Sequence, residues 1–181
     1  FYDSTPPVIS VESRAHNIRQ GGSGLVVYSL SEEAVRTGVK VGDRFFPGYL
    51  QPSGKYYAIF AFPYDLSRKK FQPVVLAQDQ AGNISEDGFY FYVKSKKFRR
   101  DRINISSSFL DAKMPQFKRD FPGGSNNLDI FLKVNREMRK QNRQKLSGYG
   151  KITAPQPLWT GSFLRQPGST MATFGDIRSY Y

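Results

Sequence analysis

The chain has 181 residues, of which 39% are hydrophobic and 15% aromatic, so it can bury the core of one large domain or two small ones. It has no cysteine, which excludes disulfides and thiolate metal sites, and no apolar run of the ~18–20 residues that a membrane-spanning helix needs. The net charge of +12 is unevenly placed, because residues 1–95 carry 10 Lys/Arg and 9 Asp/Glu whereas residues 96–181 carry 17 and 6, which predicts two parts with different roles.

Residues 1–95 contain five apolar runs that predict short β-strands. The runs are rich in Val, Ile, Tyr and Phe, and residues that favour turns separate them. They are Pro7–Ser13, Gly24–Leu30, Tyr56–Tyr64, Phe71–Asp79 and Phe89–Ser95, and Val39–Phe46 predicts a sixth strand. Strands of this length and spacing favour an antiparallel β-sandwich. Its inner face should include Val27, Ile59, Phe60 or Ala61, and Val75.

Two segments of this half resemble bacterial immunoglobulin-like modules, which begin with a Thr-Pro-Pro segment and carry Asp-x-Ala-Gly-Asn near their end. These segments are Asp3–Val11 and Ala77–Glu86. Gly82-Asn83 suits a tight turn, and Asp79 can accept hydrogen bonds from the backbone of that turn. Residues 1–95 are therefore expected to form an immunoglobulin-like antiparallel sandwich. The lone His16 is expected in a surface connection between strands, because one histidine without further His or Cys makes no zinc site.

The stretch Lys94–Arg102 has six Lys or Arg in nine residues and marks the expected boundary. Its charges could bind a polyanion or could only keep a strand or linker solvated, and the second interpretation is the more ordinary one. Residues 96–155 are expected to be a basic helical connector. A short helix within Ser107–Phe117 should be capped by Ser107 or Ser108 and stop near Pro115. A long helix, Asn127–Leu146, should be capped by Asn126 and end at Gly148.

The long helix is predicted to be amphipathic. One face carries an apolar stripe of Leu128, Ile130, Phe131, Val134 and Met138, and the opposite face carries Lys133, Arg136, Lys140 and Arg143. These four cations are candidate binding residues for phosphates or a carboxylate-rich polymer, although exposed helices often carry such residues only for solubility. Nucleic acid is not an expected partner, because most aromatic residues lie in the neutral half and cannot interleave with the basic ones.

Residues 156–181 carry the most specific pattern in the sequence. An aromatic residue precedes a Pro-Gly turn, and Thr-Phe-Gly-x-x-Arg follows. This pattern resembles the segment that opens the first strand of the catalytic sheet in lysostaphin-type zinc metallopeptidases, the LytM family of cell-wall endopeptidases. The matching residues are Phe163, Pro167, Gly168, Thr173, Phe174, Gly175 and Arg178. Segments 108–117 and 129–142 also resemble the upstream half of an envelope-associated branch of that family.

The resemblance implies that the zinc chemistry lies outside this chain. In the family, a His and an Asp follow this strand and a His-x-His pair comes later, but His16 is the only histidine here. A hydrolytic zinc site needs about three protein ligands, so no catalytic residue and no metal site are expected in this chain. Zinc is expected in a catalytic domain beyond residue 181. Residues 156–181 would then be the first part of an incomplete β domain, with Trp159, Phe163, Phe174 and Arg178 at the domain interface.

Three functions follow as hypotheses. The leading one is the non-catalytic N-terminal part of a bacterial peptidoglycan endopeptidase, periplasmic or extracellular, which positions or restrains a catalytic domain in the same chain or in a separate one. The alternative is a stand-alone module that binds peptidoglycan or another acidic polymer. A glycosidase with paired carboxylates is not expected, because the six acidic residues of the second half are scattered. We expect Phe174 and Tyr180–Tyr181 to pack against a catalytic chain, a second copy or the long helix, unless they form the tail of a self-contained module.

Overall fold

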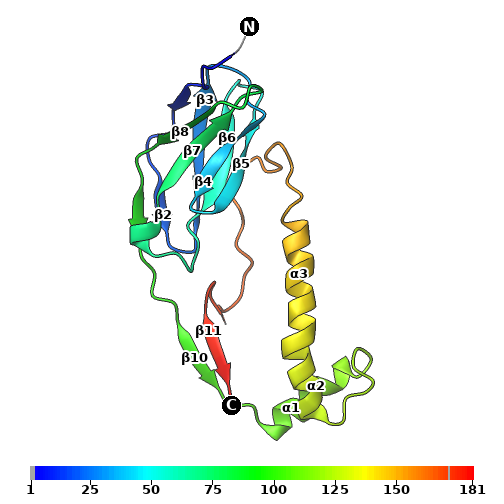
Figure 1. Ribbon diagram of the computed structural model, residues 1–181. Helices are drawn as coiled ribbons and strands as arrows, with labels where there is room; N and C mark the ends of the chain where they lie inside the picture. The colour runs from blue at the N-terminus through cyan, green and yellow to red at the C-terminus, as the bar shows by residue number, and fades with distance from the viewer. Residues whose placement is uncertain (1–2, 171) are drawn as a thin grey trace. The chain divides into compact units, whose positions relative to one another are not determined.

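The computed structural model describes residues 3–170 and 172–181, and the chain divides into two compact units (Figure 1). The β unit runs to Phe98 and includes Pro155–Gly175, and the helical unit consists of Arg99–Ala154 and Asp176–Tyr181. The expected third part, 156–181, is thus shared between the two units. Its final strand belongs to the helical unit because that strand pairs there.

The β unit is built on a seven-stranded antiparallel sheet with the strand order β1-β3-β6-β5-β4-β7-β8. Ser85 Oγ of β8 donates a hydrogen bond to the carbonyl of Pro7 just before β1 (2.6 Å), so the two edge strands approach each other and the sheet is nearly closed. The strands are β1 (Ile9–Val11), β3 (Ser23–Leu30), β4 (Arg36–Val41), β5 (Arg44–Leu50), β6 (Tyr56–Ala61), β7 (Pro73–Gln78) and β8 (Ile84–Gly88). A short parallel pair, β2 (Asn17–Arg19) and β9 (Tyr92–Lys94), and a 3₁₀ turn, η1 (Arg68–Lys70), complete the unit.

The predicted single strand Val39–Phe46 is a hairpin in the structure. Its chain reverses at Gly42, whose φ is +61°, and the strands β4 and β5 pair antiparallel on either side. Gly-Asp is a good two-residue turn because glycine adopts positive φ without steric cost. The polar strand β8 was not predicted, since its sequence, ISEDG, has little of the composition typical of strands.

The core of the β unit confirms half of the predicted inner face. Phe60 and Val75 are fully buried, but Ile59 is 53% exposed and Val27 is only half-buried. The neighbouring Val26 points inward instead of Val27. Successive side chains of a strand point to opposite faces of the sheet. A prediction that is shifted by one residue therefore assigns every side chain of that strand to the wrong face.

Tyr28 is fully buried in this core, and its hydroxyl group is hydrogen-bonded there. Its hydroxyl lies 2.9 Å from Thr37 Oγ1, and Thr37 Oγ1 donates its own hydrogen to the carbonyl of Leu76 (2.8 Å). Tyr28 is therefore the donor to Thr37. Burial raises the pKa of Tyr28 to about 12, because the phenolate would lose its hydration.

The stability of the β unit should consequently fall at high pH. A phenol whose pKa is raised by folding contributes stability that is complete below the unfolded-state pKa of about 10 and is lost as the pH rises toward 12. We expect Tyr28→Phe to remove about 2–3 kcal/mol of this pH dependence. Urea unfolding of both proteins at pH 9 and pH 12 measures it. Parallel pH profiles for the two proteins would contradict the prediction.

The helical unit has one long helical segment and one short strand pair. The helices are α1 (Ser107–Lys113) with the 3₁₀ turn η2 (Met114–Phe117), and α2 (Asn127–Lys133), which continues through the π-helical turn η3 (Val134–Met138) into α3 (Arg139–Tyr149). The strands β10 (Arg100–Ile103) and β11 (Ile177–Tyr180) are parallel. The predicted continuous helix is confirmed, although it extends to Tyr149, with Gly150 as its C-cap, and contains the π turn.

Side-chain caps start both helices. Asn126 Oδ1 accepts a hydrogen bond from Asp129 N (2.9 Å), as the sequence predicted. The first helix is capped by Ser106 rather than by Ser107 or Ser108, with Ser106 Oγ accepting from Phe109 N (3.2 Å). This error of one residue arose because three consecutive serines offer the same capping chemistry.

A small apolar core holds the helical unit together. Met114, Ile130 and Phe131 are its buried members among the described residues, and Val134 and Tyr180 pack against them. Leu128, which was predicted to share the apolar stripe, is 52% exposed. At 100° per residue it lies about 60° or more from the other members of the stripe, so it reaches the solvent.

Candidate functional site

The four predicted basic residues do not form one uniform stripe. Lys133 is engaged within its own helix, because its Nζ lies 3.0 Å from Asp129 Oδ2, and this hydrogen bond lowers the pKa of Asp129. Arg136, Lys140 and Arg143 are exposed. Their role as a binding surface stays a prediction.

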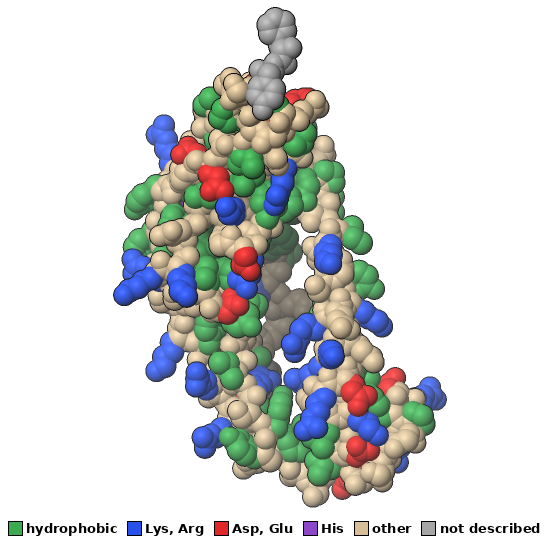
Figure 2. Space-filling model, in the orientation of Figure 1, with side chains coloured by type: hydrophobic (Ala, Val, Ile, Leu, Met, Phe, Trp, Pro, Cys, Tyr) green, Lys and Arg blue, Asp and Glu red, His purple; other side chains and the backbone are tan. Residues whose placement is uncertain are grey.

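Helix α3 is basic from Arg139 to Lys145. It carries Arg139, Lys140, Arg143 and Lys145 and no acidic residue, and each of its residues is exposed. Figure 2 shows Lys and Arg side chains along α3, and several acidic side chains near α1 and α2. A helix that is polar on all sides gains little from burial, so its composition suits an anionic partner or simple solvation equally well.

The predicted interface residues Trp159 and Phe163 contact each other, with ring centroids 5.5 Å apart. Both are substantially exposed, at 47% and 80%, and the flanking Leu158 and Leu164 are also exposed. Contiguous exposed apolar side chains are typical of interaction surfaces. The structure is therefore compatible with their predicted role but does not test it.

Phe174 lies in an aromatic cluster, which we define as Tyr64, Phe98 and Phe174. The Tyr64 ring lies edge-on to both phenylalanines, at 6.3 Å and 6.4 Å between centroids. The Phe174 carbonyl accepts a hydrogen bond from Lys96 Nζ (3.1 Å). Gly21 permits this packing, because a Cβ there would lie 2.9 Å from the Phe174 ring. Phe174 remains 63% exposed, so the cluster covers only part of it.

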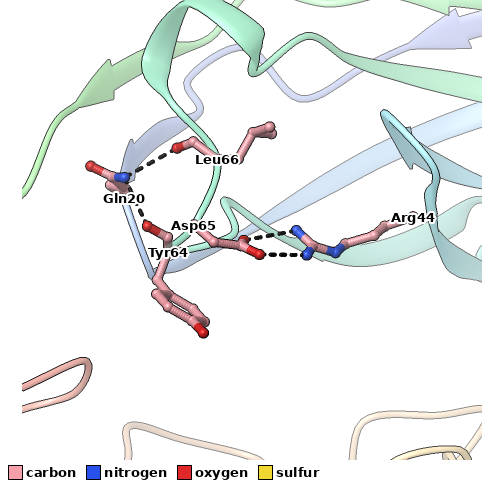
Figure 3. A network of polar contacts seen from close by, with 5 residues as sticks. All are labelled: Gln20, Arg44, Tyr64, Asp65 and Leu66. Carbon is pink, nitrogen blue, oxygen red and sulfur yellow. Dashed lines mark hydrogen bonds and ion pairs between the residues drawn. The ribbon is translucent and has the colours of Figure 1, made fainter. Parts of the chain in front are cut away.

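Polar contacts hold the loop that carries Tyr64, one of the three members of the aromatic cluster (Figure 3). Gln20 Nε2 donates to the carbonyls of Tyr64 (2.9 Å) and Leu66 (3.1 Å). Arg44 forms a bidentate ion pair with Asp65, at 3.1 Å and 2.9 Å. These hydrogen bonds from Arg44 lower the pKa of Asp65, so the pair persists at neutral pH. No sequence pattern indicated this arrangement, since its members come from separate parts of the chain.

The strand β11 places Arg178 in an ion-pair network of the helical unit. Arg178 lies opposite Asp101 of β10, with Nε 4.0 Å from Asp101 Oδ2. Arg99 bridges Asp101 (2.7 Å) and Asp176 (3.5 Å). In a parallel pair the aligned side chains lie on the same face, which brings these charges together. The predicted interface role of Arg178 is untested.

Tyr180 packs against the long helix of the chain itself, one of the three partners that we expected for it. Its ring meets Phe131 edge-on at 5.8 Å, and the Arg139 guanidinium lies 5.9 Å from the ring centroid. The following residue, Tyr181, accepts a hydrogen bond from Ile105 N (2.8 Å). These contacts also fit the alternative of a folded tail.

His16 lies in the connection between β1 and β2, as predicted, but the expectation that it is at the surface is wrong. The side chain is only 3% exposed, and its ring meets Phe89 at 4.7 Å. Its Nδ1 lies 2.7 Å from the carbonyl of Tyr90, which can only accept, so Nδ1 carries a proton. Its Nε2 lies 2.8 Å from Ser13 Oγ. Both ring nitrogens are therefore engaged in hydrogen bonds, one local and one to a distant segment, which is a structural role.

The predicted Asp79 turn is confirmed. Asp79 accepts hydrogen bonds from Asn83 N (2.9 Å) and Asn83 Nδ2 (2.8 Å), and Gly82 has a φ of +92°. Burial raises the pKa of Asp79, but the hydrogen bonds from Asn83 and from the backbone of Gly82 and Ala81 together outweigh it, so the net pKa is lowered. Asp3, Glu32 and Asp79 bring carboxylate oxygens within 4.8 Å of one another, the one such metal-sized group found in residues 3–170 and 172–181.

Comparisons with known proteins identify no family for this chain. No family model and no curated protein match the chain. Among solved structures, the BIgI domain of beta protein from S. agalactiae, solved bound to CEACAM1, is 15% identical to this chain. The match covers 50% of this chain and 99% of that one, with a TM-score of 0.31. The chain is mainly β, and a similarity of this size establishes nothing finer. No helix in the described part of the chain is long and apolar enough to cross a membrane.

Proposed function

We propose that this chain is the non-catalytic part of a peptidoglycan endopeptidase of the LytM type in the bacterial cell envelope. In this proposal it positions or restrains a zinc-dependent catalytic domain, and the β unit is an immunoglobulin-like sandwich that serves as a spacer. The pattern from Phe163 to Arg178 supports the proposal, because it resembles the segment that opens the catalytic sheet of that family.

The observation that carries the proposal is the conformation of the last residues. Gly175 adopts a φ of +81°, where a Cβ would collide with the ring of Phe98, so the Phe-Gly pair of the pattern makes a turn that only glycine fits. Strand β11 begins two residues later, at Ile177. The resemblance predicts that Phe174 and Gly175 lead into a strand, and β11 follows them.

Strand β11 also has an edge that a further strand could use. In the described part of the chain, β10 and β11 form a sheet of two strands only. Ile177 N donates to Arg99 O (2.9 Å) and Tyr181 N to Ile103 O (3.1 Å), so these amides face β10. Because amides alternate along a strand, the amide of Tyr180 faces the opposite edge. A docked catalytic sheet would pair with this edge.

Hydrogen exchange tests this pairing. The chain is measured alone and with a purified, zinc-loaded LytM-type catalytic domain from the same source. We expect exchange of the Tyr180 amide to slow about tenfold or more on addition, whereas the Ile177 and Tyr181 amides are protected already. The rate at which the catalytic domain hydrolyses peptidoglycan sacculi should change in parallel. Gly175→Ala should abolish both effects, and Gly161→Ala, whose Cβ would meet no atom within 4 Å, should not.

The alternative function, a stand-alone module for peptidoglycan or another acidic polymer, is favoured by the exposed basic residues of helix α3, which has no acidic residue. This alternative predicts a different result when the chain is mixed with sacculi and when hydrogen exchange is measured. The chain would sediment with sacculi in the absence of any catalytic domain, in a salt-dependent manner, and the Tyr180 amide would not change. That result would replace the endopeptidase proposal.

A further inference from the structure

The helical unit contains a cavity of about 430 Å³ that is open to solvent on one side, and all of its lining residues belong to that unit. Its walls are largely apolar and come from both strands and from the helices, including Ile103 of β10, Phe117, Phe131 and Tyr180 of β11. This volume falls within the range of sites that hold small organic ligands. The cavity is therefore large enough for a ligand with an apolar side chain.

Cations surround the cavity, and no carboxylate lines it. The cationic lining residues are Lys113, Arg139 and Arg178. Arg178 has a counter-charge in Asp101, 4.0 Å away. Arg139 contacts Tyr180, with one guanidinium nitrogen 3.5 Å from the hydroxyl. Lys113 and Arg139 thus favour an anionic group in the ligand.

Asn135, which also lines the cavity, indicates a second property of the ligand, a hydrogen-bond donor. It lies in the π-helical turn η3, and such turns occur frequently at functional sites. Its Nδ2 donates to the carbonyl of Phe131 (2.9 Å), which fixes Oδ1 as an acceptor. Oδ1 is buried and, among the residues that the structure describes, has no hydrogen-bond partner. A buried acceptor without a donor is unfavourable, so a ligand N–H group would be stabilising there.

We propose that this cavity binds the C-terminal end of a short peptide with an apolar last residue. The terminal carboxylate is held by Arg139 and Lys113, the apolar side chain packs against Phe131 and Tyr180, and a peptide N–H serves Asn135. A fatty acid supplies the carboxylate and the apolar chain but no N–H donor. A peptide C-terminus supplies all three. This inference does not rest on the proposed function.

Titration of the full chain with N-acetyl-Ala-Leu, followed by ¹H–¹⁵N NMR, tests the inference. We expect shifts at cavity residues with the free acid, and about tenfold weaker binding of the C-terminal amide, since the charge-assisted hydrogen bonds are lost. Arg139→Gln should weaken binding of the acid about tenfold as well. Arg143→Gln is the matched control, because Arg143 lies on the same helix, is exposed and does not line the cavity.

Two further measurements separate the peptide from other ligands. Octanoate, an apolar carboxylate without an N–H group, should bind several-fold more weakly than the peptide. Asn135→Leu should weaken peptide binding without lowering the melting temperature, because the unpaired acceptor is removed from the free protein. Equal binding of acid and amide, equal binding of octanoate and peptide, or no shifts up to about 10 mM peptide would each overturn the inference.

Discussion

Phe131→Ala should unfold the helical unit and leave the β unit folded. Phe131 is one of the three buried apolar residues described for that unit, and its ring packs edge-on against Phe109 (6.4 Å) and Tyr180 (5.8 Å). Truncating a buried phenylalanine costs about 3–5 kcal/mol. A unit with so small a core has about that much stability in total. The β unit has its own core, which contains no residue of the helical unit.

Native-state hydrogen exchange provides the measurement for this substitution. Amides of α2 and β11 should lose their protection, while those around Phe60 and Val75 keep it. Leu132→Ala is the control, because Leu132 neighbours Phe131 but is 37% exposed, and it should cost less than about 1 kcal/mol. Loss of protection in both units together would show that they fold as one cooperative body and would contradict the prediction.

Gly38→Ala should destabilise the β unit by about 3 kcal/mol or more. Gly38 lies in β4, opposite Pro47 of β5 and Leu76 of β7. A Cβ at this position would collide with the carbonyl oxygen of Phe46 and would lie 2.9 Å from the amide nitrogen of Gly48. Both atoms belong to the backbone of a paired strand, which cannot move without breaking the sheet, so the clash is not relieved cheaply.

Urea unfolding at neutral pH measures the cost, with Gly88→Ala as the matched control. Gly88 is also in a strand of the same sheet, but a Cβ there meets no atom within 4 Å. Its substitution should change the free energy of unfolding by less than about 1 kcal/mol. Equal midpoints for the two variants would show that β4 and β5 can separate locally, which would argue against the close approach described above.

The sequence alone determined the features that depend on neighbours within a few positions. The Asp79–Asn83 turn follows from a short carboxylate followed by a residue that adopts positive φ. The Asn126 cap and the long helix follow from local hydrogen bonding and a period of 3.6. Five of the predicted strand runs contain a strand for the same reason, since β-branched and aromatic composition is a local property.

The candidate sites were predictable only in part. The basic residues of the long helix could be named from their spacing, and the strand that follows Phe174-Gly175 was expected from the resemblance. The cavity of the helical unit could not, because it joins Ile103, Phe131 and Tyr180, which are far apart in the chain. The π turn that contains Asn135 was also not visible, since helical periodicity alone does not distinguish it from an α-helix.

Tertiary structure decided the features that depend on distant partners. Val27 and Ile59 lie outside the core because the pairing of β3 with β6 turns Val26 and Phe60 inward, and the composition of a strand does not reveal which alternate face is buried. His16 is buried because the carbonyl of Tyr90, 74 residues away, meets its ring. Strand β11 exists beside β10 because the chain returns to pair there, and a two-stranded ribbon is stable only when a core such as that around Phe131 supports it.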